Sequence, residues 1–288
     1  MIEELRERRL LSVVRNDSGL IGYRFAGALH EAFETLDTAL VEVVGANTTA
    51  TPHSCPTLID REALSSIGFF EKLPCIPMAA VPHGGPPSTG SDGWLLSPST
   101  CYHTFAHLAG SADLPDLGVF TARGTCHRFE PASAEPTRLA SFTMRELVLI
   151  GGADEVLRQC EVMFERGVAF LRELAADVTV ERASDVFYGE RSEVTRKVQL
   201  ARGVKKEVRI PWTDGAEVSV GSRNLHRDLF TTAFAIGSPD RGTSHSACVA
   251  FGIERLLLTL LAQTPGYDPD LLTSRILAAV ATRTALIG

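Results

Sequence analysis

Three short segments of this chain carry side chains suited to binding phosphate. The first is residues 126–130, CHRFE. In a strand, Arg128 and Glu130 project from the same face, which sets a guanidinium for phosphate beside a carboxylate for an exocyclic amine. Taken alone, the pattern also fits a surface hairpin with solvated charges.

The second segment follows Arg138 and reads as another strand over residues 139–149. Strand alternation puts Phe142, Met144 and Glu146 on one face and leaves Ser141, Thr143 and Arg145 on the other. Charged residues on both faces are unusual for a strand, and the alternative is a surface hairpin with solvated charges and a core Phe142.

The third segment is residues 248–255, CVAFGIER. It reads as a strand that turns through Gly252 into a helix with Arg255 in its first turn. An arginine at that position could meet a polyphosphate.

Two of the six cysteines, Cys101 and Cys248, could join Glu146 in a metal site. Long intervals separate these three residues, so no local motif supports the grouping. On spacing alone they are two buried structural thiols and a surface glutamate. The remaining cysteines form no CxxC pair and no framework of the secreted type.

The elements that must position these residues can be outlined from hydrophobic periodicity. Apolar spacing predicts a first helix, capped by Asp17 or Ser18. Runs of strands bracketed by helices, without regular βαβ alternation, indicate an α+β fold on an antiparallel sheet. The expected helices are residues 21–36, 61–67, 154–174, 251–261 and one capped by Asp268, and the expected later strands are 178–180, 207–212 and 216–220.

Composition sets the class of protein. The 288 residues are 44% hydrophobic and 22% charged, which fits one globular domain over residues 1–288. No apolar stretch approaches the ~20 residues of a membrane span, and the charged amino terminus is unlike a signal peptide, so we expect a cytoplasmic protein. The net charge of -7 disfavours nucleic acid, and tRNA in particular, as a partner.

Together, the three segments resemble motifs two and three of class II aminoacyl-tRNA synthetases, and in detail the seryl-tRNA synthetase catalytic domain. The resemblance implies ATP and Mg²⁺ as ligands, with Arg128 and Arg255 as the catalytic residues on the α- and γ-phosphates. It also implies the remaining ATP-binding residues: Glu130 on the adenine amine, Arg138, Phe142 stacked on adenine, and Glu217 on magnesium.

The sequence departs from the usual motif three, where Cys248 and Ala250 replace two glycines. A zinc-dependent branch resembles it better: the methanogen-type seryl-tRNA synthetases and their truncated relatives, the amino acid:[carrier protein] ligases. That branch implies Zn²⁺ bound by Cys101, Glu146 and Cys248. Three protein ligands leave a fourth position open for the substrate amine.

The first helix of the catalytic domain is expected near residue 20, which leaves no room for an amino-terminal tRNA-binding domain. We therefore prefer the truncated ligases, which join a small amino acid, glycine or alanine, to the phosphopantetheine thiol of a carrier protein. The substrate candidates are Lys205, Ser222 and Asn224, with His226 as a further pocket candidate. His103 and His127 are expected to be satisfied core histidines.

Residues 191–209 form a basic run that could dock an acidic carrier or be a solvated helix face, and Lys205 could instead approach the active site. The resemblance also implies a homodimer formed through the first helix and the strand leading to Pro52. Two alternatives stay open: transfer of the amino acid to another acceptor, such as tRNA, a metabolite or a peptide, and a non-catalytic regulatory paralog.

Overall fold

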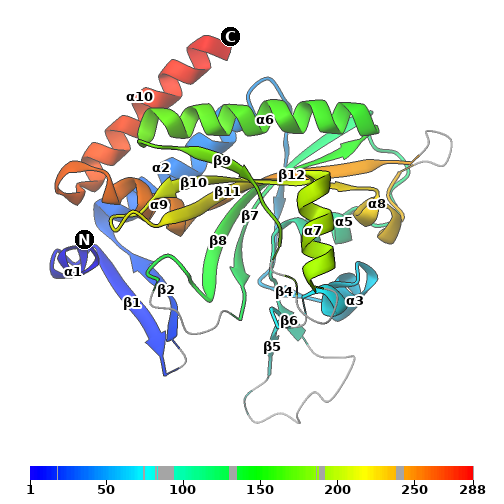
Figure 1. Ribbon diagram of the computed structural model, residues 1–288, viewed down its shortest axis with the longest axis horizontal. Helices are drawn as coiled ribbons and strands as arrows, with labels where there is room; N and C mark the ends of the chain where they lie inside the picture. The colour runs from blue at the N-terminus through cyan, green and yellow to red at the C-terminus, as the bar shows by residue number, and fades with distance from the viewer. Residues whose placement is uncertain are drawn as a thin grey trace.

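The computed structural model is built on one seven-stranded sheet (Figure 1). It describes residues 1–17, 19–73, 75–81, 83, 94–129, 135–185, 187, 192–237 and 243–287. All neighbouring strands of this sheet are antiparallel except the parallel pair β3 and β7. In spatial order the strands are β3 (Thr51–Ser54), β7 (Leu117–His127), β8 (Ser141–Gly151), β12 (His245–Gly252), β11 (Glu217–Arg227), β10 (Lys205–Pro211) and β9 (Thr179–Arg182).

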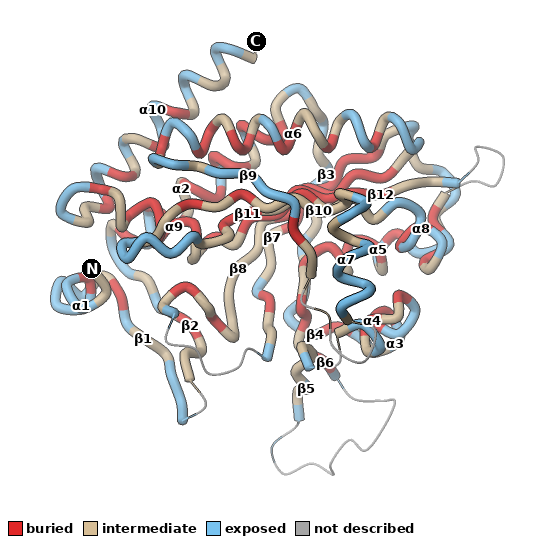
Figure 2. Tube along the Cα trace, in the orientation of Figure 1, coloured by how far each residue is buried: buried red, intermediate tan, exposed pale blue. Residues whose placement is uncertain are grey.

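Three helices pack against one face of the sheet, and the carboxyl-terminal helix packs against these helices (Figure 1). Their apolar sides and the facing strand residues form the larger core cluster, which appears as the red band under α6 in Figure 2. A periodic apolar stripe on each helix accounts for this packing. These helices are α2 (Gly27–Val44), α6 (Ala153–Leu174), α9 (Ile253–Ala262) and α10 (Pro269–Ile287).

Shorter elements cover part of the opposite face around a second core cluster. Cys101 and Cys248 both belong to this second cluster. The elements are α3 (Arg61–Ser66), α4 (Phe69–Lys72), α5 (Cys101–His107), α8 (Leu229–Ala233) and a small sheet of β4 (Leu58–Ile59), β6 (Trp94–Leu96) and β5 (Met78–Ala80).

Strand alternation divides β8 between the two faces, as the sequence predicts. Leu147 and Leu149 belong to the helix-covered core, whereas Val148 and Ile150 belong to the second cluster. Arg145 reaches Asp37 of α2 on the helix side. The even-numbered residues of β8 therefore face the second cluster.

A β-bulge between β10 and β11 places functional candidates on one face. Arg209 pairs with Ser219 and Val208 with Gly221, which leaves Val220 as the extra residue. Glu217 and Ser222 are an odd number of residues apart and would otherwise point to opposite faces. Because of the bulge, both lie on the face that carries Lys205.

The remaining elements lie at the edges of the fold. Helix α1 (Ile2–Glu7) leads into a hairpin of β1 (Leu11–Asn16) and β2 (Gly19–Phe25). Helix α7 (Ser192–Arg202) connects β9 to β10, and a short 3-10 turn (Pro265–Tyr267) precedes α10. No helix in the described ranges is both long and apolar enough to cross a membrane.

The expected first helix over residues 21–36 is wrong in its bounds. Residues 19–25 are strand β2, and α2 begins at Gly27 with Ala26 as its N-cap, so Asp17 does not cap it; Ser18 lies outside the described residues. Pairing of β2 with β1 outweighs local helical spacing in this segment. Leu157, which shares the apolar spacing of α6 in the sequence, is 47% exposed.

Other expected elements are confirmed. The α+β class is correct, and α3, α6 and α9 agree with their predicted ranges to within a few residues. Asp268 accepts a hydrogen bond from the Asp270 amide at the start of α10, as a capping residue does. Residues 82–93, a stretch of the sequence rich in Gly and Pro, lie outside the described residues, apart from His83.

Candidate active site

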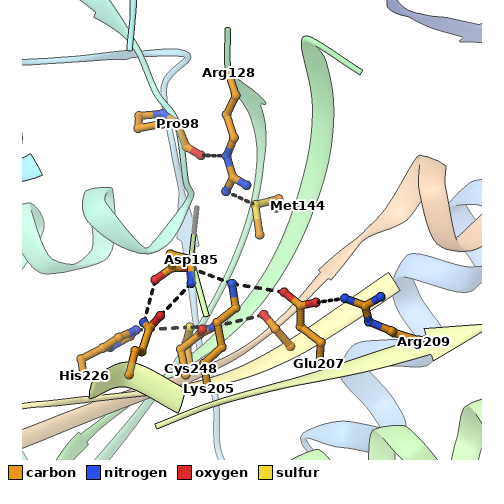
Figure 3. Close-up of polar contacts among 12 residues, drawn as sticks. Pro98, Arg128, Met144, Asp185, Lys205, Glu207, Arg209, His226 and Cys248 are labelled. Atoms are coloured by element: carbon orange, nitrogen blue, oxygen red, sulfur yellow. Dashed lines mark hydrogen bonds and ion pairs between the residues drawn. The ribbon is translucent and has the colours of Figure 1, made fainter. Parts of the chain in front are cut away.

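Arg128 lies directly after β7 and is held from two sides. Its Nε donates to the Pro98 carbonyl at 2.9 Å, and its Nη2 approaches the Met144 sulfur at 3.6 Å (Figure 3). The guanidinium lies 5.2 Å from the centroid of the Phe142 ring, a cation–π distance. The hairpin of β7 and β8 thus brings Arg128 and Phe142 together, as predicted. Glu130 lies outside the described residues.

Arg255 stands in the first turn of α9, also as predicted. Its Nε donates to the Thr137 carbonyl at 3.0 Å and its Nη1 to the Ser219 carbonyl at 3.1 Å. These bonds tie the segment before β8 to β11. Arg138, close to Thr137 in that segment, forms an exposed ion pair with Glu135 at 3.3 Å.

Glu217 lies at the outer end of β11 and is exposed. Its Oε1 accepts a hydrogen bond from the Thr179 hydroxyl at 3.2 Å. It shares the sheet face with the other candidates, although its contact is with β9.

Cys101, Glu146 and Cys248 are all buried on the second face of the sheet. The thiols of the two cysteines lie within hydrogen-bonding reach of each other. Glu146 Oε1 accepts from the Ser99 hydroxyl at 2.8 Å and from the backbone amides of Thr100 and Cys101 at 2.9 and 3.2 Å. The fold therefore gathers three residues that long intervals separate in the sequence.

The surroundings keep both thiols protonated. The hydrogen bond with Cys248, burial and the Glu146 charge raise the pKa of Cys101 well above its usual value. For Cys248, the hydrogen bond with Cys101 lowers the pKa, but burial and the Glu146 charge raise it more, so the net shift is upward. A cation among these groups would reverse that balance, because a coordinating thiol is deprotonated.

The donor types of this trio are those that zinc takes in proteins: thiolate sulfur and carboxylate oxygen. Throughout the described part of the chain, however, no group of three or more His, Cys, Asp or Glu side chains is arranged to hold a metal ion. The residue types of the trio thus suit zinc, although the described side chains are not arranged around a metal position.

Asn224 and His226 both approach the Cys248 sulfur. Asn224 Nδ2 donates to Ser222 Oγ at 3.0 Å and to Cys248 Sγ at 3.5 Å. The Nε2 atom of His226 lies 3.6 Å from the same sulfur. Burial lowers the pKa of His226 to about 4, so the ring is neutral near pH 7. A register shift at the end of β11 admits this ring.

Lys205 lies on the active face of β10, which favours the interpretation that it approaches the site. Its Nζ donates to Asp185 Oδ1 at 2.6 Å and contacts Glu207 Oε1 at 3.2 Å (Figure 3). Burial lowers the pKa of Lys205, but Asp185 and Glu207 raise it more, so the lysine stays charged. Glu207 could have been found from its alternation with Lys205; no sequence signal marks Asp185.

Much of the basic run over residues 191–209 is neutralised. Lys206 pairs with Glu161 of α6, and Arg209 pairs with Glu181 at 2.6 Å. Arg191 lies outside the described residues. The basic charge that faces solvent is therefore concentrated on α7, none of whose described side chains is buried.

His103 and His127 are not the satisfied core histidines that the sequence suggested. The Nε2 atom of His103 and the Nδ1 atom of His127 are buried and have no hydrogen-bond partner among the described residues. Burial lowers the pKa of both rings, so each is neutral near pH 7.

The fold that carries this site is that of class II aminoacyl-tRNA synthetase catalytic domains. A seryl-tRNA synthetase from Methanopyrus kandleri, solved with Aquifex aeolicus tRNASec, superposes with a TM-score of 0.77 at 21% identity, covering 96% of this chain and 59% of that one. A prolyl-tRNA synthetase from Giardia lamblia gives 0.69 at 15% identity, covering 91% and 52%. Both likenesses are ones of fold.

Sequence comparison finds relatives with a more particular activity. An amino acid–[acyl-carrier-protein] ligase from Bradyrhizobium diazoefficiens is 35% identical over 176 residues, 60% of this chain and 53% of the relative. A type-2 serine–tRNA ligase from Methanopyrus kandleri is 27% identical over 62% of this chain and 36% of its own length. The aligned segments thus span about half or less of each relative. No family model matches the chain.

Proposed function

We propose that this chain is the catalytic domain of a ligase that activates a small amino acid with ATP and transfers it to the phosphopantetheine thiol of a carrier protein. The supporting observation is that Arg128 and Phe142 share one sheet face with Cys101, Glu146 and Cys248. Phosphate-binding and amine-binding chemistry would then meet on adjacent strands. Similarity to the Bradyrhizobium ligases favours this acceptor over tRNA.

In the first step, an oxygen of the amino-acid carboxylate attacks the α-phosphorus of ATP. A new P–O bond forms and pyrophosphate leaves. Arg128 would bind the α-phosphate and Arg255 the γ-phosphate, so that both neutralise charge in the transition state. Phe142 would stack on adenine and Glu130 would bind its amine, with Arg138 as a further ATP contact and Glu217 as a ligand of Mg²⁺.

In the second step, the pantetheine sulfur attacks the activated carbonyl carbon. A thioester forms and AMP leaves, while the thiol proton passes to solvent. Lys205 is a substrate-binding residue in this proposal, because its ammonium lies among carboxylates on the same sheet face. It would contact the amino-acid carboxylate or the α-phosphate once ATP is bound.

We propose zinc as the resident metal, held by Cys101, Glu146 and Cys248. Bound zinc supplies an open coordination position that selects a free α-amine. Asn224 and His226 already contact Cys248, so they would orient this ligand from outside the metal's own shell. Ser222, Asn224 and the His226 ring crowd the same place, which favours glycine or alanine over larger side chains.

Helix α7 is the proposed docking surface for the carrier. Val194 is 63% exposed and Val198 42% exposed, one helical turn apart, with Lys197 between them. A small apolar stripe with basic neighbours suits an acidic helical protein. The homodimer expected from the class is likewise a proposal for the full protein.

Acceptor choice tests the proposed function. Labelled glycine or alanine with ATP is incubated separately with holo-carrier protein, apo-carrier protein and tRNA. We expect label on holo-carrier alone, removed by mild base or hydroxylamine as a thioester is. Label on tRNA would contradict the carrier as acceptor and would indicate that tRNA accepts the amino acid. If no amino acid is activated, the result would favour a non-catalytic paralog.

A further inference from the structure

One carboxylate at the centre of this site has no role in the mechanism above. Asp185 lies in the segment between β9 and α7, and in Figure 3 it stands between Lys205 and His226, below Arg128. Burial raises the pKa of Asp185, but Lys205, Gln199 and Arg128 lower it more, so it is ionised. The same negative charge acts on His226.

Two separate elements depend on Asp185. Its Oδ1 accepts from Lys205 Nζ at 2.6 Å, and the Lys205 side chain is 14% exposed. Its Oδ2 accepts from Gln199 Nε2 at 2.9 Å, and its backbone amide donates to Gln199 Oε1 at 2.7 Å. Both ends of the Gln199 amide are thus bound to one residue.

Helix α7 gains little from burial, because none of its described side chains is buried. Side-chain hydrogen bonds must then contribute much of its attachment. Each is worth ~1 kcal/mol, and more when a charged group takes part. The two bonds of Gln199 therefore form a substantial anchor for a helix of this length.

We propose that Asp185 is a positioning residue that couples α7 to the amino-acid site. Its carboxylate fixes the Lys205 ammonium on the sheet face, and its bonds to Gln199 fix α7 beside it. A change in the position of α7 is therefore transmitted to Lys205. This inference rests on the proposed function. Asp185 is the residue through which a carrier protein bound to α7 would affect the position of Lys205.

The test uses the full chain with three substitutions and a matched control. Asp185→Ala removes the side-chain contacts with both Lys205 and Gln199. Asp185→Asn keeps a hydrogen-bond partner for Gln199 but removes the negative charge that faces Lys205. Gln199→Ala releases α7 and leaves the Asp185–Lys205 ion pair intact. Glu193→Gln is the control, because it breaks only the exposed Glu193–Arg196 pair of α7. Hydrogen exchange of residues 192–202 and the KM for the amino acid are measured for each.

We expect Asp185→Ala and Gln199→Ala to speed exchange in α7 by about tenfold, and the control to leave it unchanged. Both Asp185 variants are expected to raise the KM by about tenfold, with Gln199→Ala raising it less. Native exchange in Asp185→Ala would overturn the anchoring. A lower melting temperature with a native KM would show a merely structural residue and would overturn the coupling.

Hydrogen exchange does not depend on activity, so failure of the proposed function can be distinguished from failure of the role inferred for Asp185. If the unaltered protein activates no amino acid, the proposed function fails. The exchange of α7 still decides whether Asp185 anchors this helix.

Discussion

At the scale of single residues, the arrangement around Cys248 explains why a departure from the usual motif is tolerated. A glycine pair would leave space where the structure has a sulfur in contact with Cys101, Asn224 and His226. Cys101 comes from α5, whereas Asn224 and His226 both come from β11. In the proposed zinc site, this cysteine would supply a metal ligand that glycine cannot.

The metal assignment predicts a paired loss. Cys101→Ser and Cys248→Ser should each lose bound zinc and amino-acid activation together, since each removes one of three protein ligands. Elemental analysis of purified protein measures the metal. The exposed Cys75 provides the control substitution Cys75→Ser. Unchanged zinc in both ligand variants would rule out the site.

The adenine assignment predicts a selective loss of ATP affinity. Phe142→Leu should raise the KM for ATP by about tenfold or more, because base–aromatic stacking is worth ~1–3 kcal/mol. Phe70 carries an arginine, Arg61, over its ring at 4.6 Å and lies outside the site. Phe70→Leu is therefore the matched control. Equal KM values for ATP in the two variants would contradict the assignment.

At the scale of elements, polar contacts lock α2 and α9 to the sheet. Asp37 of α2 receives both Nε and Nη2 of Arg145 at 2.8 and 2.5 Å, and its side chain is 5% exposed. Glu254 of α9 accepts from the backbone and hydroxyl of Thr143. These contacts fix β8, which carries both Phe142 and Glu146.

Removing Asp37 should therefore be costly for stability. Asp37→Ala leaves the Arg145 guanidinium without its partner, and we expect a loss of ~3 to 5 kcal/mol in the free energy of unfolding. Urea denaturation measures it. Glu155→Gln breaks the exposed Glu155–Arg158 pair and should change the stability far less, because solvent screens this pair. Similar losses in both variants would contradict the account of how α2 is held.

Because of Glu254, we expect the stability of the fold to depend on pH with a sign opposite to that given by most ion-paired carboxylates. Burial raises its pKa above the ordinary 4.5, although Thr143 opposes the shift. Between 4.5 and its raised value, the folded state binds more protons than the unfolded state, so stability falls as pH rises. Glu254→Gln should flatten this part of the profile, measured by urea midpoints from pH 4 to 7. A profile identical to that of the unaltered protein would contradict the prediction.

Sequence reasoning found the elements whose pattern is local. Helix α6 follows from its apolar spacing, and the turn from β12 into α9 follows from Gly252. It missed the boundary of β2 and α2, because β2 forms through pairing with β1. It missed Asp185 because contacts with Gln199 and Lys205, 14 and 20 residues along the chain, place that residue outside any helix or strand pattern.

At the scale of the whole molecule, the seven-stranded sheet separates two core clusters. Long helices pack against one face (Figure 2), and the cysteines of the proposed metal site belong to the core cluster on the other. The trio of Cys101, Glu146 and Cys248 was grouped in the sequence by resemblance alone. In the fold, β8 lies beside β12, and this strand order places Glu146 near Cys248. The β10–β11 bulge adds Glu217 and Ser222 to this face, which alternation alone could not predict.

Amino-acid-dependent exchange of pyrophosphate into ATP tests the central claim most directly. All twenty amino acids are tried on zinc-assayed, folded protein without tRNA or carrier. We predict exchange with one or two small amino acids, glycine or alanine first, because the adenylate forms before any acceptor is needed. Silence with all twenty amino acids on zinc-loaded, folded protein would contradict the claim that this site activates amino acids.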